Sequence, residues 1–242
     1  MKAKTAVNPF LVFAFQLLIS LQMLLVFGDS LLRPIDVVRC FHNAFRRDMA
    51  RIDNSVLSIA REGGDMNPSF DQLQIMSEFL DYHARGEEAA VFPAVEKIAP
   101  FLAEAYILDH RELDKMVHDL EEIRRKTDPL TAARATAVLN SHLRIHLDKE
   151  DVHLYPILRE RTTDDEQASI GKILASRTPP ERSASSVQWL FPLLDLDDQV
   201  IVTKAWMSLM PPPVFAMIKP LIRKSVAENW VEVTRQIPGL SD

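Results

Sequence analysis

The chain contains one sequence phrase twice, and this repeat constrains its fold more than any other feature. The first copy, HARGEEAAVFP, runs from His83 to Pro93, and the second, HLDKEDVHLYP, runs from His146 to Pro156. In both copies a glutamate follows the histidine by four residues, a second acid comes next, and an aromatic residue and a proline close the phrase. Residues four apart lie on one face of an α-helix. Because a buried charge is costly unless it is paired or metal-bound, two such helices facing each other predict a metal site.

The composition favours helix throughout. The chain of 242 residues contains only 6 glycines, and 47% of its residues are hydrophobic, so we expect an all-α protein. The net charge of −6 comes without a basic stripe, which argues against nucleic-acid binding. The single cysteine, Cys40, excludes an internal disulfide and a thiolate zinc site. Its presence alone fits a reducing compartment, and we interpret it as a small core residue.

An apolar segment of about 18 residues, residues 10–27, lies near the N-terminus. This length is at the lower limit for a membrane span, which needs about 20 residues. Positive charge after the segment at least matches the charge before it, so the charge bias does not demand export. Four interpretations stay open: a membrane anchor, a cleaved signal, an additional helix packed on the bundle, or a start codon placed too early. We expect a cytoplasmic domain, with or without an anchor at residues 10–27.

Hydrophobic spacing and helix breakers predict four long helices. They are expected at residues 34–61, 70–91, 103–126 and from about residue 131 to residue 156 and beyond, the last with Thr131 as its N-cap. Phe92 and Pro93 are expected to interrupt or shift the second helix. The candidate metal ligands follow on these helices in order: His42; His83 and Glu87; His110; His146 and Glu150. A duplicated helical hairpin, folded into an up-down-up-down bundle, would bring them together at its centre.

Over about residues 34–162 the pattern resembles the hemerythrin-like, or HHE cation-binding, family. The motif is a lone histidine, His-x3-Glu-[Glu/Asp]-x3-[Phe/Tyr]-Pro, a second lone histidine, and the same phrase again. The resemblance implies a four-helix bundle around two irons, with His42 and His83 on one iron, His110 and His146 on the other, and Glu87 and Glu150 bridging them. Oxygen-carrying members have a further histidine where this chain has Asp114, so the chain looks more like the iron-sensing and bacterial regulatory branches. Imidazole with carboxylate suits iron, and also manganese or zinc.

The acids and histidines beside this motif are expected to have lesser roles. Glu88 and Asp151 should face solvent or hydrogen-bond the ligands rather than bind metal. His142 lies one turn before the histidine of the second phrase, and it is a candidate for an outer hydrogen bond or an extra ligand. His118 and His153 are expected on or near the surface.

The chain divides, in this prediction, into a hydrophobic segment (residues 1–30), a metal-binding bundle (residues 31–162) and a smaller helical region (residues 163–242). In the last region we expect helices at 164–175, 183–194 and 197–210, and one long helix from about 213 to 236 that Pro220 kinks. The segments 166–168, 189–192 and 206–211 are similar to the regions that follow hemerythrin-like domains in plant BRUTUS-type iron-regulated ubiquitin ligases and some bacterial relatives. No RING or other zinc-finger cysteines are present, so ligase activity does not carry over.

Three functions are compatible with these features, and we expect the first. It is a non-enzymatic module with two irons that senses or buffers iron, oxygen or nitric oxide, while the C-terminal helices transmit the signal to a protein partner. The second is a di-iron oxidase or peroxidase-like enzyme, which needs proton donors near the metals, where Tyr82 and Tyr155 are the only candidates. The third is a structural adaptor whose metal holds the fold together.

Overall fold

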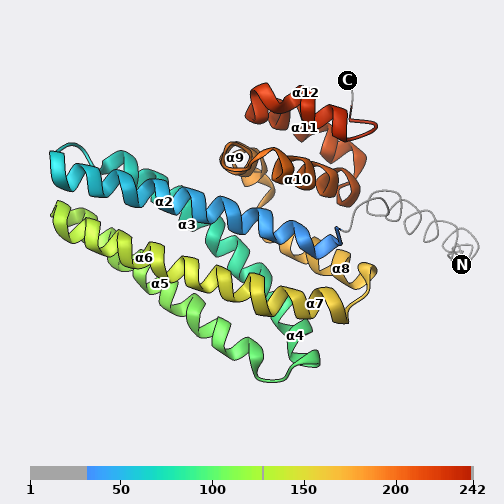
Figure 1. Ribbon diagram of the computed structural model, residues 1–242, viewed down its shortest axis with the longest axis horizontal. Helices are drawn as coiled ribbons and strands as arrows, with labels where there is room; N and C mark the ends of the chain where they lie inside the picture. The colour runs from blue at the N-terminus through green and yellow to red at the C-terminus, as the bar shows by residue number, and fades with distance from the viewer. Residues whose placement is uncertain (1–31, 127, 241–242) are drawn as a thin grey trace, which may run out of the picture.

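The computed structural model describes residues 32–126 and 128–240, and all regular structure within these ranges is helical. Four long helices form the bundle: α2 (Val38–Glu62), α3 (Asn67–Gly86), α5 (Leu102–Lys126) and α6 (Pro129–Lys149). A short 3₁₀ turn, η1 (Pro34–Val37), precedes α2. Helix α2 packs on both α3 and α6, and α5 packs on the same two helices (Figure 1). The predicted all-α fold with a four-helix bundle is therefore confirmed.

Both copies of the repeated phrase contain a π-helical turn. The turns are η2 (Glu87–Val91) and η3 (Glu150–Leu154), and each leads directly into a short α-helix, α4 (Phe92–Ile98) or α7 (Tyr155–Arg161). The amide of the aromatic residue bonds the carbonyl of the glutamate five residues earlier, as in a π-helix. The proline that follows has no amide to donate, so the wide turn places it where the helix can continue. The expected interruption at Phe92 and Pro93 is thus a shift of the helix and not a break.

The start of α6 differs from the prediction. The N-cap is Asp128 and not Thr131, because the Asp128 carboxylate accepts a hydrogen bond from the Leu130 amide. Pro129 then occupies the first helical position, where its missing amide costs nothing. Thr131 lies in the first turn and donates its hydroxyl to Asp128.

The C-terminal region wraps one side of the bundle with short helices (Figure 1). They are α8 (Asp164–Ala175), η4 (Pro180–Arg182), α9 (Ser183–Leu190), η5 (Phe191–Leu193), α10 (Leu196–Leu209), α11 (Pro212–Val226), η6 (Ala227–Asn229) and α12 (Trp230–Gln236). The single long helix expected from residue 213 to 236 is wrong. Ala227 takes a left-handed φ of 46° and ends α11, although α11 does continue past Pro220. The break is accompanied by burial of Trp230 and Val233 from α12 in the core.

One hydrophobic core joins the bundle to most of the C-terminal helices. It contains Phe45 and Leu147 from the bundle together with Trp189, Phe191 and Val233 from the C-terminal region. A second cluster, around Val91, Phe92 and Leu158, closes the end of the bundle beside α4 and α7.

The prediction of a membrane anchor at residues 10–27 lies outside the described residues. Among the helices within residues 32–126 and 128–240, none is both long and apolar enough to cross a membrane.

Candidate metal centre

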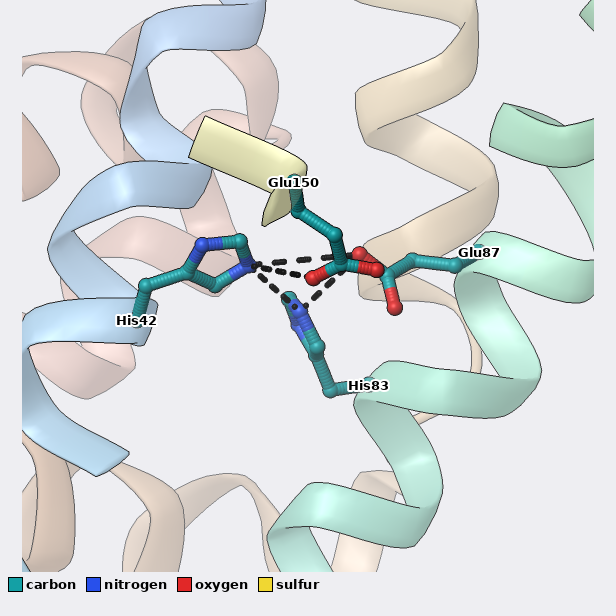
Figure 2. A group of neighbouring side chains, drawn as sticks. All are labelled: His42, His83, Glu87 and Glu150. Atoms are coloured by element: carbon teal, nitrogen blue, oxygen red, sulfur yellow. Dashed lines mark hydrogen bonds and ion pairs between the residues drawn. The ribbon is translucent and has the colours of Figure 1, made fainter. Parts of the chain in front are cut away.

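The bundle brings the six predicted ligands together at its centre. They form two groups of four, and within each group every residue offers a ligand atom within 4.8 Å of the others. The first group is His42, His83, Glu87 and Glu150, drawn in Figure 2; the second is Glu87, His110, His146 and Glu150. Five of the six residues are buried, and the side chain of His83 is only 9% exposed. The six residues thus converge as predicted, and their ligation of metal stays a prediction.

Glu87 and Glu150 belong to both groups because each carboxylate directs one oxygen toward each. Glu87 places Oε1 3.3 Å from His83 Nε2 and Oε2 3.4 Å from His110 Nε2. Glu150 places Oε2 3.6 Å from His42 Nε2 and Oε1 3.3 Å from His146 Nε2. Each group therefore offers two imidazole nitrogens and two carboxylate oxygens.

Three of the four imidazoles are oriented by an outer carboxylate on Nδ1. The distances are 2.8 Å from His42 to Asp151, 3.1 Å from His110 to Glu88, and 3.3 Å from His146 to Asp109. A histidine that donates from Nδ1 leaves Nε2 with a free lone pair, which is the form that binds metal. Hydrogen bonding by Glu88 and Asp151 is one of the two roles predicted for them. The contact of Asp109 with His146 was not predicted, because Asp109 precedes the lone histidine His110 and lies outside the repeated phrase.

His83 is the exception, and the repeat explains why. Asp109 precedes the second lone histidine and bonds His146; the corresponding residue, before His42, is Phe41. The Phe41 ring stacks on the His83 ring, with centroids 6.4 Å apart and an angle of 20° between the planes. Phe45 meets the same imidazole edge-on at 5.4 Å. Within the described residues, no carboxylate hydrogen-bonds His83 Nδ1, so aromatic packing orients this imidazole.

Several buried ligand atoms lack a hydrogen-bond partner among the described residues. They are Glu87 Oε2, His110 Nε2 and both carboxylate oxygens of Glu150. Unpartnered buried polar atoms are costly, and these four point into the space that the two groups enclose. Cations coordinated in both ligand groups would satisfy all of them. The donors present thus fit a metal-binding role.

Burial shifts the proton affinities at the centre in opposite directions. Burial and the charge of Glu87 raise the pKa of Glu150 well above its usual range. Burial also acts to raise the pKa of Glu87, but the imidazoles of His83 and His110 hold it well below its usual range. Burial lowers the pKa of His146 to about 4. Without a cation the two facing carboxylates therefore do not both ionise, whereas a bound cation would compensate both charges.

Tyr155 is the phenol nearest to the centre. It is buried, and its hydroxyl donates to Glu87 Oε1 at 2.5 Å. Burial and the charge of Glu87 raise the pKa of Tyr155 well above its usual range, so the hydroxyl keeps its proton. Tyr82, by contrast, donates to Glu78 and does not reach the centre. Of the two tyrosines that the sequence suggested as proton donors, Tyr155 reaches a candidate ligand and Tyr82 does not.

A pocket of about 380 Å³ opens onto the centre, and its walls include the four ligands His83, Glu87, His110 and His146. Asp114 lies at this pocket, exposed and paired with Arg111 at 3.7 Å. It belongs to neither ligand group. Small molecules therefore have space beside the candidate ligands.

The remaining histidines lie away from the centre. His142, a candidate for an extra ligand, is exposed on α6, so that alternative is wrong. A residue four positions earlier on a helix lies near the same face but is rotated away from it. In this bundle only the position of His146 is buried, and that of His142 is not. His118 and His153 are exposed, as predicted. Cys40 is buried as a free thiol, and burial raises its pKa, which agrees with a core role.

A family model, the hemerythrin HHE cation-binding domain, matches residues 33–158, about half of the chain. The chain belongs to the hemerythrin HHE family. The matched range contains all six candidate ligands and both π turns.

The curated relatives of this hemerythrin-family chain are plant proteins. It is 21% identical to a zinc finger protein described as BRUTUS-like from Arabidopsis thaliana, over 72% of this chain and 16% of that protein. It is 23% identical to the zinc finger protein BRUTUS of the same plant, over 68% of this chain and 14% of the relative. This chain thus spans about a sixth of their length. No solved structure matches the chain.

Proposed function

We propose that this hemerythrin-family chain binds two irons and senses or buffers iron, oxygen or nitric oxide without catalysing a reaction. The observation that carries the proposal is the sharing of Glu87 and Glu150 between two ligand groups. A carboxylate that turns one oxygen to each of two cations lowers their mutual repulsion. A single cation would leave one pair of imidazoles and one pair of buried oxygens without a partner.

The donor set favours iron. Each group mixes neutral imidazole with carboxylate and contains no thiolate, a combination that suits iron, manganese or zinc and disfavours soft metals. Iron adds a redox couple and positions for an exogenous ligand, which sensing of a gas requires. Four protein donors in each group leave such positions at an octahedral metal, and the pocket beside His110 gives a small ligand access.

A chain of ring contacts supports transmission of a signal to the C-terminal helices. The imidazole of His83 packs on Phe45, and Phe45 lies 5.0 Å from Trp189 in α9. Trp189 also donates to Asp48 of α2 at 2.7 Å. A change in the position of His83 would therefore act through Phe45 on Trp189 of the C-terminal region, which would carry the readout to a protein partner.

Metal analysis of the purified full chain tests the proposal. We expect two irons per chain with visible absorption bands of bridged iron, and we expect both to be lost in the His83→Ala, His146→Ala double variant. The matched control is His142→Ala, His153→Ala, which removes two exposed imidazoles near the same phrase. It should keep its iron. Equal metal in the two double variants, or none in the unmodified chain, would exclude this ligand assignment.

A di-iron oxidase is the second candidate, and Tyr155 is the observation that favours it. Its hydroxyl touches a ligand carboxylate and could transfer a proton at that oxygen. Steady turnover of peroxide or of a reductant by iron-loaded protein, abolished in Tyr155→Phe, would replace the sensing proposal with this one. Absence of turnover with a saturable spectral response to oxygen or nitric oxide supports sensing.

A further inference from the structure

An apolar cavity lies between the bundle and the C-terminal helices, beside the core that joins them. It has a volume of about 290 Å³, and its walls come from α2, α3, α8, α9, α10 and α11. Aromatic rings dominate it, among them Phe41, Phe79, Trp189 and Trp206. Small-molecule sites in proteins have this character: concave, mostly apolar, with a few polar groups.

The lining of the cavity contains a positive charge and no negative charge. Lys172 of α8 is its one ammonium group, and no carboxylate lines it. Lys172 is exposed and forms no ion pair with a residue in the described part of the chain. The hydroxyls of Thr178 and Ser183 lie among the same lining residues. An anionic group at Lys172 could therefore gain a charge-assisted hydrogen bond without displacing an existing partner.

We propose that this cavity binds an anionic amphiphile, with an acyl chain among the aromatic rings and a carboxylate at Lys172. At about 30 Å³ for each water-sized group, 290 Å³ holds roughly ten such groups, which is a medium-length chain. A peptide helix, about 10 Å across, does not fit this volume. The occupant is a small molecule.

Gly171 shows that the cavity has room beside α8. A Cβ placed on Gly171 meets only Leu209 Cδ1, at 4.0 Å. A Cβ there meets no backbone atom of a neighbouring element within 4 Å, and Gly171 itself lines the cavity, so a larger side chain is expected to take up cavity space. Gly171 forms no part of the metal centre, so it offers a variant that fills the cavity and leaves the ligands in place.

The cavity also touches the metal centre through His83, which lines both it and the pocket beside the ligands. Occupation of the cavity and of the centre should therefore influence each other. This coupling rests on the proposed function, whereas binding of the amphiphile does not. Measuring binding first on metal-free protein keeps the two proposals separate.

The test uses decanoate and the full chain in the presence of a chelator. Trp189 and Trp206 line the cavity, so we expect a saturable change in tryptophan fluorescence, checked by calorimetry. Gly171→Leu should weaken binding at least about tenfold, and Gly171→Ala should retain it. Circular dichroism establishes that both variants are folded. Binding that survives in Gly171→Leu would place decanoate elsewhere, for example on the apolar residues 10–27, and would overturn the proposal.

The role of Lys172 is tested by a surface change that does not endanger folding. Lys172→Gln should weaken decanoate binding about tenfold, as expected for loss of a charge-assisted hydrogen bond, while binding of decanol stays unchanged. Equal loss for decanoate and decanol, or no loss for either, would contradict an anion site. Iron-loaded and metal-free protein should then differ in decanoate affinity. Equal affinities would exclude the coupling through His83 but would not affect the proposal that the cavity binds decanoate.

Discussion

Single carboxylates outside the two candidate ligand groups orient three of the four candidate ligand imidazoles. Asp151, Glu88 and Asp109 each contact the Nδ1 atom of one histidine and so fix its tautomer and ring direction. The two acids that follow Glu87 and Glu150 in sequence reach across to histidines on α2 and α5, the helices that carry no glutamate ligand. Each copy of the phrase thus supplies candidate ligands and also a carboxylate that orients a histidine on another helix.

Asp151→Asn should lower metal affinity by about 10- to 100-fold, because it replaces the charged carboxylate that orients His42 with a neutral amide. Asp148→Asn is the matched control, since Asp148 also bonds Arg46 but is exposed and touches no ligand. Competition with a chromophoric chelator measures both affinities. If the two variants lose affinity equally, the effect comes from Arg46 and not from the orientation of His42.

A buried acid far from the centre makes stability depend on pH. Asp48 accepts hydrogen bonds from Trp189 and Gln72, but burial outweighs them and raises its pKa. Because the folded state then binds a proton more tightly than the unfolded chain, the free energy of unfolding falls as pH rises from about 4 through the raised pKa. Asp48→Asn cannot ionise, so its stability relative to the unmodified chain should increase over that window and level off above it. Urea unfolding at several pH values measures the difference, and a flat difference would contradict it.

At the scale of helices, the two π turns and the approach of α8 shape the centre. The turn η2 begins at Glu87, directly after Gly86, and Leu174 of α8 lies against Gly86. A Cβ on Gly86 would lie 3.1 Å from Leu174 Cα and 2.8 Å from Leu174 Cδ2. Backbone cannot yield as a flexible side chain does, so only glycine allows α8 to lie against this turn.

Gly86→Ala should therefore destabilise the chain by about 1–3 kcal/mol through overpacking. The control is Gly171→Ala on α8 itself, where the new methyl group meets nothing closer than 4.0 Å. That change should leave stability unchanged or raise it by up to about 1 kcal/mol, since alanine favours helix. Chemical unfolding of both variants gives the comparison. Similar losses in the two would show that α8 is generally intolerant of a methyl group and that the contact with Leu174 is not special.

Sequence alone could predict the four bundle helices and the convergence of the six candidate ligands, because hydrophobic spacing and the repeated phrase dictate them. For Glu88 and Asp151 it left two roles open, facing solvent or bonding a ligand. It could not predict the π turns, since a proline after an aromatic residue permits either a break or a wide turn. It also could not predict the break at Ala227, because no glycine or proline marks it. There φ is positive, and Trp230 and Val233 are buried directly after the break. The roles of Asp109 and Phe41 could not be predicted either, because their contacts with His146 and His83 depend on how the helices pack.

For the molecule as a whole, the shared core predicts one unfolding unit. The bundle and the C-terminal helices bury residues in the same cluster, and Trp189 contacts both Phe45 and Asp48. The predicted division between residues 162 and 163 stays a prediction, and the shared core predicts that the two parts do not unfold independently. Metal at the centre should stabilise the C-terminal region as much as the bundle.

Metal at about 100 times its dissociation constant adds about 2.7 kcal/mol per site. For a chain of this size each site should raise the unfolding midpoint by roughly 5 to 10 °C, so two filled sites should raise it by roughly 10 to 20 °C. With Trp206 and Trp230 replaced by phenylalanine, fluorescence reports on Trp189 alone, while circular dichroism reports on all helices. Both signals should give one transition at the same midpoint, and metal should shift them together. A Trp189 transition that precedes the loss of helix and ignores metal would show that the C-terminal region unfolds on its own.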